Sequence, residues 1–153
     1  MVIKMGLFLR KVNLNDCGLL FDWANDEEVR KNSFNKNKIL YENHIDWFNS
    51  MIKLNNCIIF ILCYDDIDVG QVRINIENNC GIIDYSIDKR YRGRGYGYKI
   101  LYMLEKYIIS DCINVNRLVG NVKNSNIKSQ KAFEKNNYKK ILEKECFIYL
   151  KEI

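Results

Sequence analysis

The stretch DYSIDKRYRGRGYG, residues 84–97, decides the fold of this chain. The alternating segment at about Gly81–Asp88 predicts a strand, and the apolar spacing after it predicts a helix over about Gly95–Ser110. Backbone N–H groups at a helix start have no partner within the helix and lie at the positive end of its dipole. Three interleaved glycines would let a bulky anion approach them. The stretch therefore predicts a phosphate or pyrophosphate site.

Two familiar phosphate loops do not fit these residues. A dinucleotide-binding loop would need a glycine where Tyr98 stands, and an acidic residue where Asn121 and Val122 stand. A Walker loop would need Gly-Lys-Ser/Thr after the glycines, which this stretch lacks. The remaining pattern is Arg92-x-x-Gly95-x-Gly97 directly after a strand.

This pattern resembles the pyrophosphate loop of the Gcn5-related N-acetyltransferase (GNAT) family, Gln/Arg-x-x-Gly-x-Gly/Ala. A second segment, Asn126 to Tyr138, resembles the family's later signature, an Asn-led helix ending in Tyr/Phe-Glu-Lys-x-Gly-Phe. Asn137 replaces the glycine, and asparagine is the next best residue for a left-handed helix end. The motifs occur in family order, and the resemblance extends from residue 2 to about residue 142.

The whole chain, residues 1–153, is predicted to be one N-acetyltransferase domain of the α/β (α+β) class. Strands are expected at 3–10, 57–64, 69–77, 81–88, 117–122, 138–142 and 146–150. Helices are expected at 14–23, 26–31, 41–54, 95–110 and 125–136. Meandering strand pairs followed by a strand–helix–strand crossover imply a mixed, mostly antiparallel sheet. The resemblance implies the GNAT fold, with six to seven strands and helices on both faces.

Composition and charge argue against several classes of protein. No apolar run approaches the ~20 residues of a membrane span, and the N-terminal MVIKMGLFLRKV alternates like a strand and is unlike a signal peptide. The six cysteines lack metal-ligand spacing, so we expect no metal. Most of them lie in apolar stretches and no export signal is seen, so we expect buried free thiols and a cytoplasmic location. The net charge of +5 is modest, and a basic cluster coincides with the glycines. We therefore expect no nucleic-acid partner.

The resemblance implies acetyl-CoA as co-substrate. Main-chain groups of Tyr85, Ser86 and Ile87 would align the pantetheine, and the N–H of Ile87 or Asp88 would stabilise the oxyanion. Asn126 would contact the cofactor's other end. The expected pyrophosphate loop comprises Arg92, Gly93, Arg94, Gly95, Tyr96 and Gly97, with added charge from the two arginines.

Many relatives supply a tyrosine as general acid where this chain has Phe133, which cannot donate a proton. Ser129 lies four residues earlier on the same helix face and is the candidate donor, or else a small packing residue. A coenzyme A thiolate could also leave with little assistance. Asp84 could accept the amine proton, directly or through water, with Glu77 or water alone as alternatives.

The N-terminal half is expected to bind the acceptor. Its strings FDWANDEEVRKNS, residues 21–33, and YENHIDWF, residues 41–48, resemble a GNAT branch with a Trp-Arg-Asn-Asp string before a His-x-x-Trp helix. That branch includes acetyltransferases for nucleotide-linked amino sugars of pseudaminic-acid-type pathways. Ala24 replaces the usual arginine, whereas Asn25, Asp26 and Arg30 match. Candidate acceptor-binding residues are Trp23, Asn25, Arg30, His44, Trp47, Arg73 and Asn75.

Physical chemistry supports parts of this set. Trp23, Trp47 and His44 offer rings suited to a sugar or uracil, although each also fits a structural role. The polar strand face that contains Arg73 would be buried by helices unless a cleft opens there. Its guanidinium would bind a diphosphate or carboxylate, or pair with Glu77 on the same face.

These residues predict an acyltransferase that moves an acetyl group from acetyl-CoA to a primary amine on a small molecule, with a nucleotide-linked amino sugar as the leading acceptor. We expect a monomer or homodimer without a membrane partner. Two alternatives stay open. One is protein N-terminal acetylation of the ribosomal-protein type, which shares the Ser129 arrangement, and the other is a catalytically silent acyl-CoA-binding module.

Overall fold

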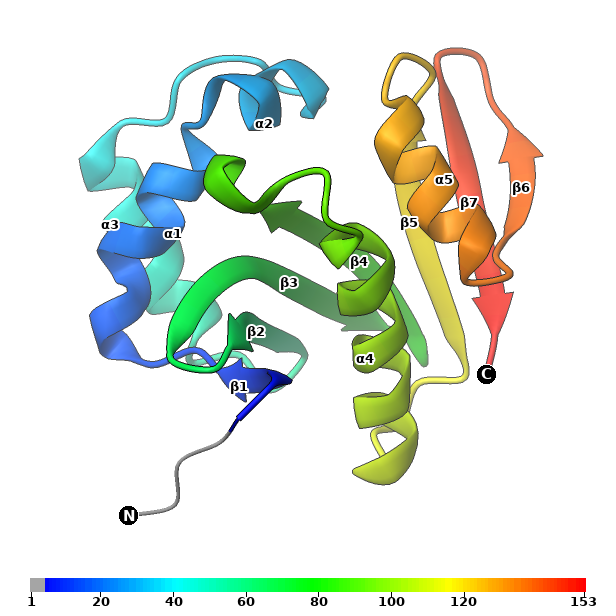
Figure 1. The fold of residues 1–153 in the computed structure, drawn as a ribbon, viewed down its shortest axis with the longest axis horizontal. Helices are drawn as coiled ribbons and strands as arrows, with labels where there is room; N and C mark the ends of the chain where they lie inside the picture. The colour runs from blue at the N-terminus through cyan, green and yellow to red at the C-terminus, as the bar shows by residue number, and fades with distance from the viewer. Residues whose placement is uncertain (1–4) are drawn as a thin grey trace.

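Seven strands form one sheet with helices on both faces in the computed structural model, which describes residues 5–153 (Figure 1). The strands are β1 Leu7–Lys11, β2 Cys57–Tyr64, β3 Ile67–Glu77, β4 Cys80–Ile87, β5 Arg117–Lys123, β6 Lys139–Leu142 and β7 Cys146–Glu152. Their order in the sheet is β1-β2-β3-β4-β5-β7-β6. Among these strands β4 and β5 pair in parallel and the other neighbours are antiparallel, which confirms the predicted mixed sheet.

The described residues also form five α-helices. They are α1 Cys17–Ala24, α2 Glu27–Asn32, α3 Tyr41–Met51, α4 Tyr96–Ser110 and α5 Ile127–Lys135. Side chains of α4 and α5 pack on one face, and those of α1 and α3 pack on the other. Strand β2 serves both faces, because Phe60 and Leu62 join the first core and Ile59 and Ile61 join the second. Burial on both faces explains its continuous apolar sequence, CIIFILC.

The N-terminal elements differ in detail from the prediction. The first strand begins at Leu7, and the expected strand residues 3 and 4 lie outside the described residues. The helix expected from residue 14 begins as a short 3₁₀ turn and continues as α1; of the two candidate caps in the sequence, Asn13 and Asn15, Asn13 caps the turn. Apolar spacing predicts a buried stripe of Ile45, Phe48 and Ile52 on α3. The helix instead buries His44 and Phe48, because that side faces α1 and β2.

The turns follow the predicted chemistry. Asp65 has φ 54°, and Asn78 and Asn79 have φ 50° and 62°, so these hairpin residues adopt the left-handed conformation. Asn137 has φ 64° after the end of α5. Asparagine therefore replaces the family glycine at that position without a change in backbone geometry.

Strands β4 and β5 separate halfway along their length. Their pairing ends at Ile83 and Gly120, after which β4 continues beside β3 and β5 continues beside β7. Phe133 of α5 packs against the bare backbone of Gly120, where an added Cβ would lie only 2.2 Å from the para carbon of the ring. The separation opens the sheet where β4 runs into the glycine-rich turn.

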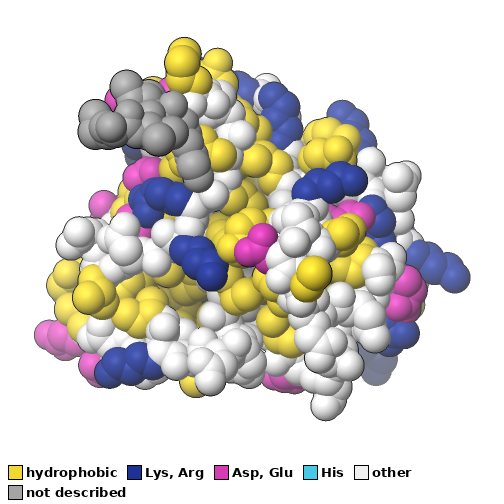
Figure 2. Space-filling model, turned by 90° about the horizontal axis from the view of Figure 1, so that it is seen from below, with side chains coloured by type: hydrophobic (Ala, Val, Ile, Leu, Met, Phe, Trp, Pro, Cys, Tyr) yellow, Lys and Arg dark blue, Asp and Glu magenta, His cyan; other side chains and the backbone are white. Residues whose placement is uncertain are grey.

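The described part of the surface is mixed in character. On the face seen in Figure 2, hydrophobic side chains are interspersed with both basic and acidic ones. No helix between residues 5 and 153 is both long enough and apolar enough to cross a membrane. The same residues contain no group of three or more His, Cys, Asp or Glu side chains placed to hold a metal ion. All six cysteines are free thiols, as expected, but only Cys57 and Cys63 are buried.

Candidate active site

The glycine-rich turn leads into the N-terminus of the 15-residue helix α4. Gly93 and Gly95 have φ 78° and 80°, a conformation that side chains rarely adopt, and Gly95 is the residue that caps the helix. No heavy atom lies within 4 Å of the place where a Cβ on either glycine would be. The N–H groups that begin α4 are therefore approachable by a large anion.

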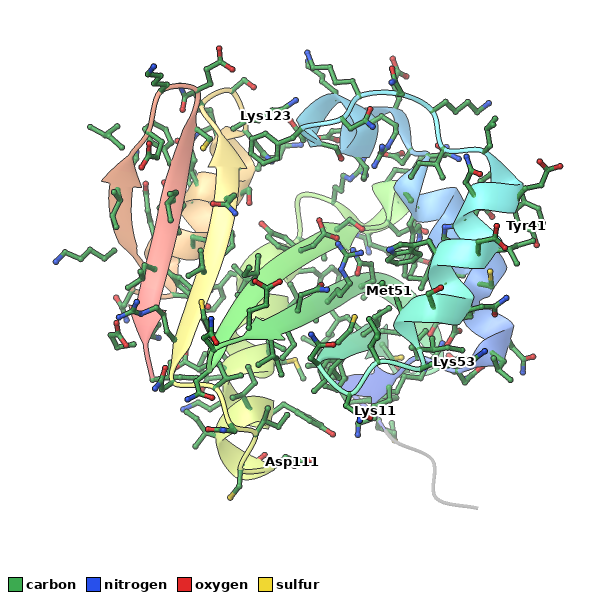
Figure 3. The ribbon with its side chains drawn as sticks, turned by 180° about the vertical axis from the view of Figure 1, so that it is seen from behind. Lys11, Tyr41, Met51, Lys53, Asp111 and Lys123 are labelled. Atoms are coloured by element: carbon green, nitrogen blue, oxygen red, sulfur yellow. The ribbon has the colours of Figure 1, made fainter. Side chains whose placement is uncertain are left out.

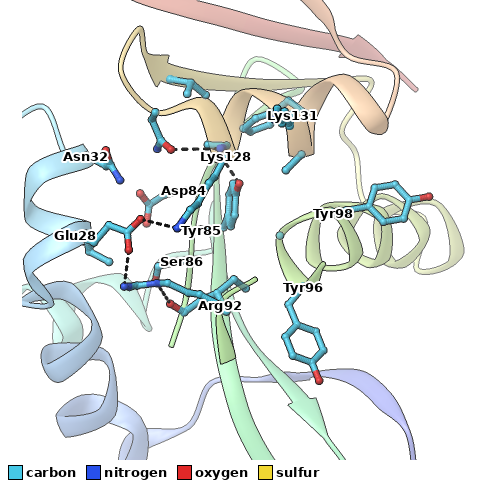
Figure 4. A pocket seen from close by; sticks show the side chains of 18 of the residues that line it. Glu28, Asn32, Asp84, Tyr85, Ser86, Arg92, Tyr96, Tyr98, Lys128 and Lys131 are labelled. Carbon is cyan, nitrogen blue, oxygen red and sulfur yellow. Dashed lines mark hydrogen bonds and ion pairs between the residues drawn. The ribbon is translucent and has the colours of Figure 1, made fainter. Parts of the chain in front are cut away.

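A cavity of about 450 Å³ lies beside this turn, between the end of β4, helix α5 and helix α2 (Figure 4). It contains most of the predicted cofactor residues, namely Tyr85, Ser86, Ile87, Arg92, Gly93, Gly95, Tyr96, Gly97, Asn126 and Ser129. Asp88 and Arg94 do not line it. The guanidinium of Arg94 instead lies over the Tyr91 ring, 5.5 Å from its centroid.

The direction of the β4 peptide groups decides which of them face the opened sheet. The N–H of Asp88 donates to the carbonyl oxygen of Val69 on β3 at 2.9 Å, so it is not available to a ligand. Peptide groups alternate along a strand, so the N–H of Ser86 also points to β3, whereas those of Tyr85 and Ile87 point to the gap. The predicted oxyanion contact at Asp88 is therefore wrong.

The side chain of Asp88 has a structural role instead. Its carboxylate accepts hydrogen bonds from the Trp23 indole at 2.8 Å and from the guanidinium of Arg90 at 2.9 Å. The bonds from Arg90 hold the pKa of Asp88 well below its usual value, against the opposing effect of burial, and the Trp23 bond adds to them. Asp88 thus fastens α1 to the end of β4.

Arg92 links the turn to helix α2. Its guanidinium donates to Asp26 at 2.6 Å and to Glu28 at 2.8 Å, and its Nε donates to the Ile87 carbonyl at 3.0 Å. Burial is the largest single effect on Asp26 and raises its pKa, but the hydrogen bond and charge of Arg92, together with backbone N–H bonds from Val29 and Glu28, leave that pKa lowered. Because two carboxylates already neutralise the Arg92 side chain, its predicted contribution of free positive charge is not supported. Its backbone still belongs to the turn.

Helix α2 also reaches across the opened sheet. Glu28 pairs with Lys128 of α5 at 3.3 Å, and the ammonium of Lys123 on β5 donates to the carbonyl oxygen of Lys31 at 3.0 Å (Figures 3 and 4). Glu28 and Lys128 both line the cavity. The N-terminal half therefore closes one side of the cavity through contacts that no local sequence pattern predicted.

Helix α5 presents Ser129 to the same cavity. Asn126 caps the helix by accepting a hydrogen bond from the N–H of Ser129 at 3.3 Å. The Ser129 hydroxyl lies 3.0 Å from the hydroxyl of Tyr85. Phe133 is a core residue, 2% exposed, with its ring stacked on Tyr149. The polar groups on this wall thus come from Ser129 and Tyr85.

A second cavity, of about 410 Å³, lies on the opposite face of the sheet beside α1 and α3. The residues common to both cavities are Val29, Ser33, Asp84, Tyr85 and Ser86. Three of them are consecutive on β4, at the point where the strand has left β5. Ligands bound in the two cavities would therefore meet at residues 84–86.

Arg73 is held at the wall of the second cavity. Its guanidinium lies over the Trp47 ring, 5.1 Å from the centroid, and its Nε donates to Asn75 at 3.1 Å. The nearest carboxylate partner is Asp84 of β4, at 4.0 Å, and not the expected Glu77, because the β3–β4 register places Arg73 opposite Asp84. Asp84 remains largely exposed.

Other predicted acceptor residues take structural roles. Asn25 exchanges two hydrogen bonds with the backbone of Ile39, and Arg30 donates to the carbonyl oxygens of Ala24, Asn35 and Asn37. Asn25 and Asn75 do not line the second cavity, whereas Arg30 does. Together these bonds shape the segment 33–39 that borders the cavity.

The predicted aromatic residues lie at this cavity, and two of them are buried. Trp23 and His44 line the cavity but are only 6% and 3% exposed, and a ring nitrogen of each lies within hydrogen-bond distance of another part of the protein. The Nε2 atom of His44 lies 2.8 Å from the carbonyl oxygen of Cys17. Trp47 is more exposed and is the better placed of the three to stack on a ligand.

Comparison with known proteins agrees with this geometry. A family model described as an acetyltransferase (GNAT) domain matches residues 6–139. A comparison with curated proteins finds no match.

Several solved structures share the fold. A domain from Methanocaldococcus jannaschii DSM 2661 has 21% identity and a TM-score of 0.83, with 98% of this chain and 100% of that chain covered. The ribosomal L7/L12 alpha-N-protein acetyltransferase RimL, in complex with coenzyme A, has 16% identity and a TM-score of 0.84, with 99% and 97% covered. The acetyltransferase AAC(6')-Ib, in complex with ribostamycin and coenzyme A, has 14% identity and a TM-score of 0.82, with 96% and 93% covered.

Proposed function

This chain belongs to the GNAT acetyltransferase family, and from that premise we propose that it moves an acetyl group from acetyl-CoA to a primary amine on a nucleotide-linked amino sugar. One observation carries the proposal. Two cavities on opposite faces of the sheet share the segment Asp84–Ser86 of β4. This arrangement suits a reaction in which a thioester enters from one side and an amine from the other.

The first cavity suits acetyl-CoA. The N–H groups at the start of α4 would hold the pyrophosphate, and the gap edge of β4 would align the pantetheine. Tyr85 borders both cavities, whereas Ile87 borders the first alone. We therefore assign the oxyanion contact to the N–H of Tyr85, which is the gap-facing N–H two residues before that of Ile87.

The charges of the second cavity favour an acceptor that carries an anion. Its lining contains Arg30 and Arg73 but only one carboxylate, Asp84. An aminoglycoside is a polycation and would meet the Arg73 guanidinium beside Trp47. A nucleotide diphosphate suits that guanidinium, and a uracil or sugar ring suits the Trp47 face.

Asp84 is the candidate base. Its carboxylate lies at the junction of the cavities and accepts a hydrogen bond from Gln71 at 3.2 Å. Because Asp84 is largely exposed, an intervening water could carry the amine proton to it. Ser129 is the candidate donor to the departing sulfur.

The acceptor class is tested by incubating the protein and acetyl-CoA with a UDP-4-amino sugar, N-terminal peptides or an aminoglycoside, and measuring thiol release. We expect release with the amino sugar. Exclusive acetylation of peptides would replace this proposal with protein N-terminal acetylation. Coenzyme A binding without thiol release for any amine would indicate a catalytically silent module.

Arg73→Ala should raise the acceptor KM several-fold and leave the acetyl-CoA KM unchanged. The variant should also keep its melting temperature, because Asp84 is exposed and Asn75 is neutral, so no buried charge loses its partner. Arg73→Lys keeps the charge but loses the planar fork and should be intermediate. A lowered melting temperature with both KM values raised would show that Arg73 is a structural residue.

A further inference from the structure

The phenol of Tyr85 lies in the candidate site although the proposed reaction uses only its backbone. Strand β4 turns this side chain toward α4 and α5, where the ring lies edge-on to Phe133. A Cβ added to Gly97, in the first turn of α4, would be 3.6 Å from the Tyr85 hydroxyl. The hydroxyl is therefore held where the two helices meet, 3.0 Å from Ser129.

The chemistry of the two hydroxyls sets the direction of their hydrogen bond. A phenol is more acidic than an aliphatic alcohol, so Tyr85 donates and Ser129 accepts. Desolvation raises the pKa of Tyr85 to about 12, so the phenol stays protonated at neutral pH and does not supply a proton itself.

This bond also decides where the Ser129 hydrogen points. A helical serine commonly turns its hydroxyl back to the carbonyl four residues earlier. In the described residues the Ser129 hydroxyl has Tyr85 as its hydrogen-bond partner, and both residues line the cofactor cavity. With Tyr85 as donor, the serine hydrogen is directed away from the phenol and remains available to a ligand.

We propose that Tyr85 is a positioning residue whose hydroxyl holds Ser129 so that the serine O–H points at the thioester sulfur. The inference rests on the proposed function. The amine nitrogen forms a bond to the thioester carbonyl carbon. When the carbon–sulfur bond then breaks, its electron pair stays on sulfur, and Ser129 donates a hydrogen bond to that thiolate. The thiolate then takes a proton from solvent, while the amine proton leaves through water or Asp84, so the protons balance.

The packing of Phe133 explains why the hydroxyl that positions Ser129 comes from β4 and not from residue 133. The para carbon of the Phe133 ring is the atom nearest to Gly120, so a hydroxyl at that carbon would meet the backbone of β5. The position where many relatives carry a tyrosine is therefore filled by core packing. Tyr85 reaches the same wall from β4, with its ring edge-on to Phe133.

The test uses bound coenzyme A, so it does not depend on the identity of the acceptor. The thiol of the complex is titrated by the ultraviolet absorbance of its thiolate in wild type and in Tyr85→Phe. Tyr138→Phe is the matched control, because Tyr138 also packs edge-on against Phe133. Among the described residues its buried hydroxyl has no hydrogen-bond partner.

In wild type the bound thiol should have a lower pKa than free coenzyme A. Tyr85→Phe should raise that pKa by about 0.5 and lower kcat roughly fivefold, the effect of one hydrogen bond, with the acetyl-CoA KM unchanged. Tyr138→Phe should leave both values as in wild type. In a Ser129→Ala background, Tyr85→Phe should have no further effect.

An unchanged thiol pKa in Tyr85→Phe, or an equal loss of kcat with and without Ser129, would overturn the inference and leave the proposed function standing. A wild-type protein that does not bind coenzyme A would overturn the proposed function, and the inference with it. These failures are distinguishable because binding is measured by calorimetry before the titration.

Discussion

Gly95→Val is expected to lower the affinity for acetyl-CoA by roughly tenfold or more, as calorimetry would measure it. Gly95 has φ 80° at the cap of α4, and its missing Cβ faces open space in the cofactor cavity. A valine there would place two methyl groups where the pyrophosphate is expected. It would also force the turn out of the conformation that aims the helix N–H groups at the phosphates.

Gly6→Val is a matched control for the strain of the substitution. Gly6 has φ 82° and, like Gly95, has no heavy atom within 4 Å of its Cβ position, but it does not line either cavity. Both variants should lose similar stability in a thermal melt, and only Gly95→Val should lose affinity. If Gly95→Val bound acetyl-CoA normally, the phosphates would have to bind elsewhere.

The cofactor side of the site could be predicted from sequence because its determinants are local. The glycines, the preceding strand and the following helix lie within one continuous segment, and their geometry follows from backbone preferences. The same holds for Asn137, whose left-handed conformation was predicted from its position after a helix. Alternation along β3 likewise predicted the polar face that lines the second cavity.

The acceptor side was less predictable because its contacts are long-range or involve the backbone. Arg30 and Asn25 matched a family string but mostly bind carbonyl and N–H groups, which carry no residue-specific signal. Arg92 finds Asp26 and Glu28 on a helix more than sixty residues earlier in the chain. Such ion pairs depend on how the N-terminal and C-terminal halves of the chain pack together, and composition and periodicity do not predict that packing.

The contact of the Tyr85 side chain is a third feature that the sequence did not predict. Alternation along β4 places Tyr85 on the opposite face from Asp84 and Ser86, but it does not indicate which helix residue the phenol reaches. That contact depends on the depth at which α5 packs, which the lack of a side chain at Gly120 sets through Phe133. Because Phe133 is part of this core packing, we do not expect a Phe133→Tyr change to restore a proton donor.

Ser129→Ala is expected to lower kcat roughly 100-fold, because the departing thiolate loses a hydrogen bond and such bonds to charged groups contribute up to about 3 kcal/mol. The acetyl-CoA KM should change little, since the backbone N–H of residue 129 still bonds to Asn126 and alanine suits a helix. Ser125→Ala, the same change at an exposed position just before α5, should leave kcat unaffected. Steady-state thiol release measures both variants. Near-normal turnover in Ser129→Ala would mean that the thiolate leaves unassisted and that Ser129 is a packing residue.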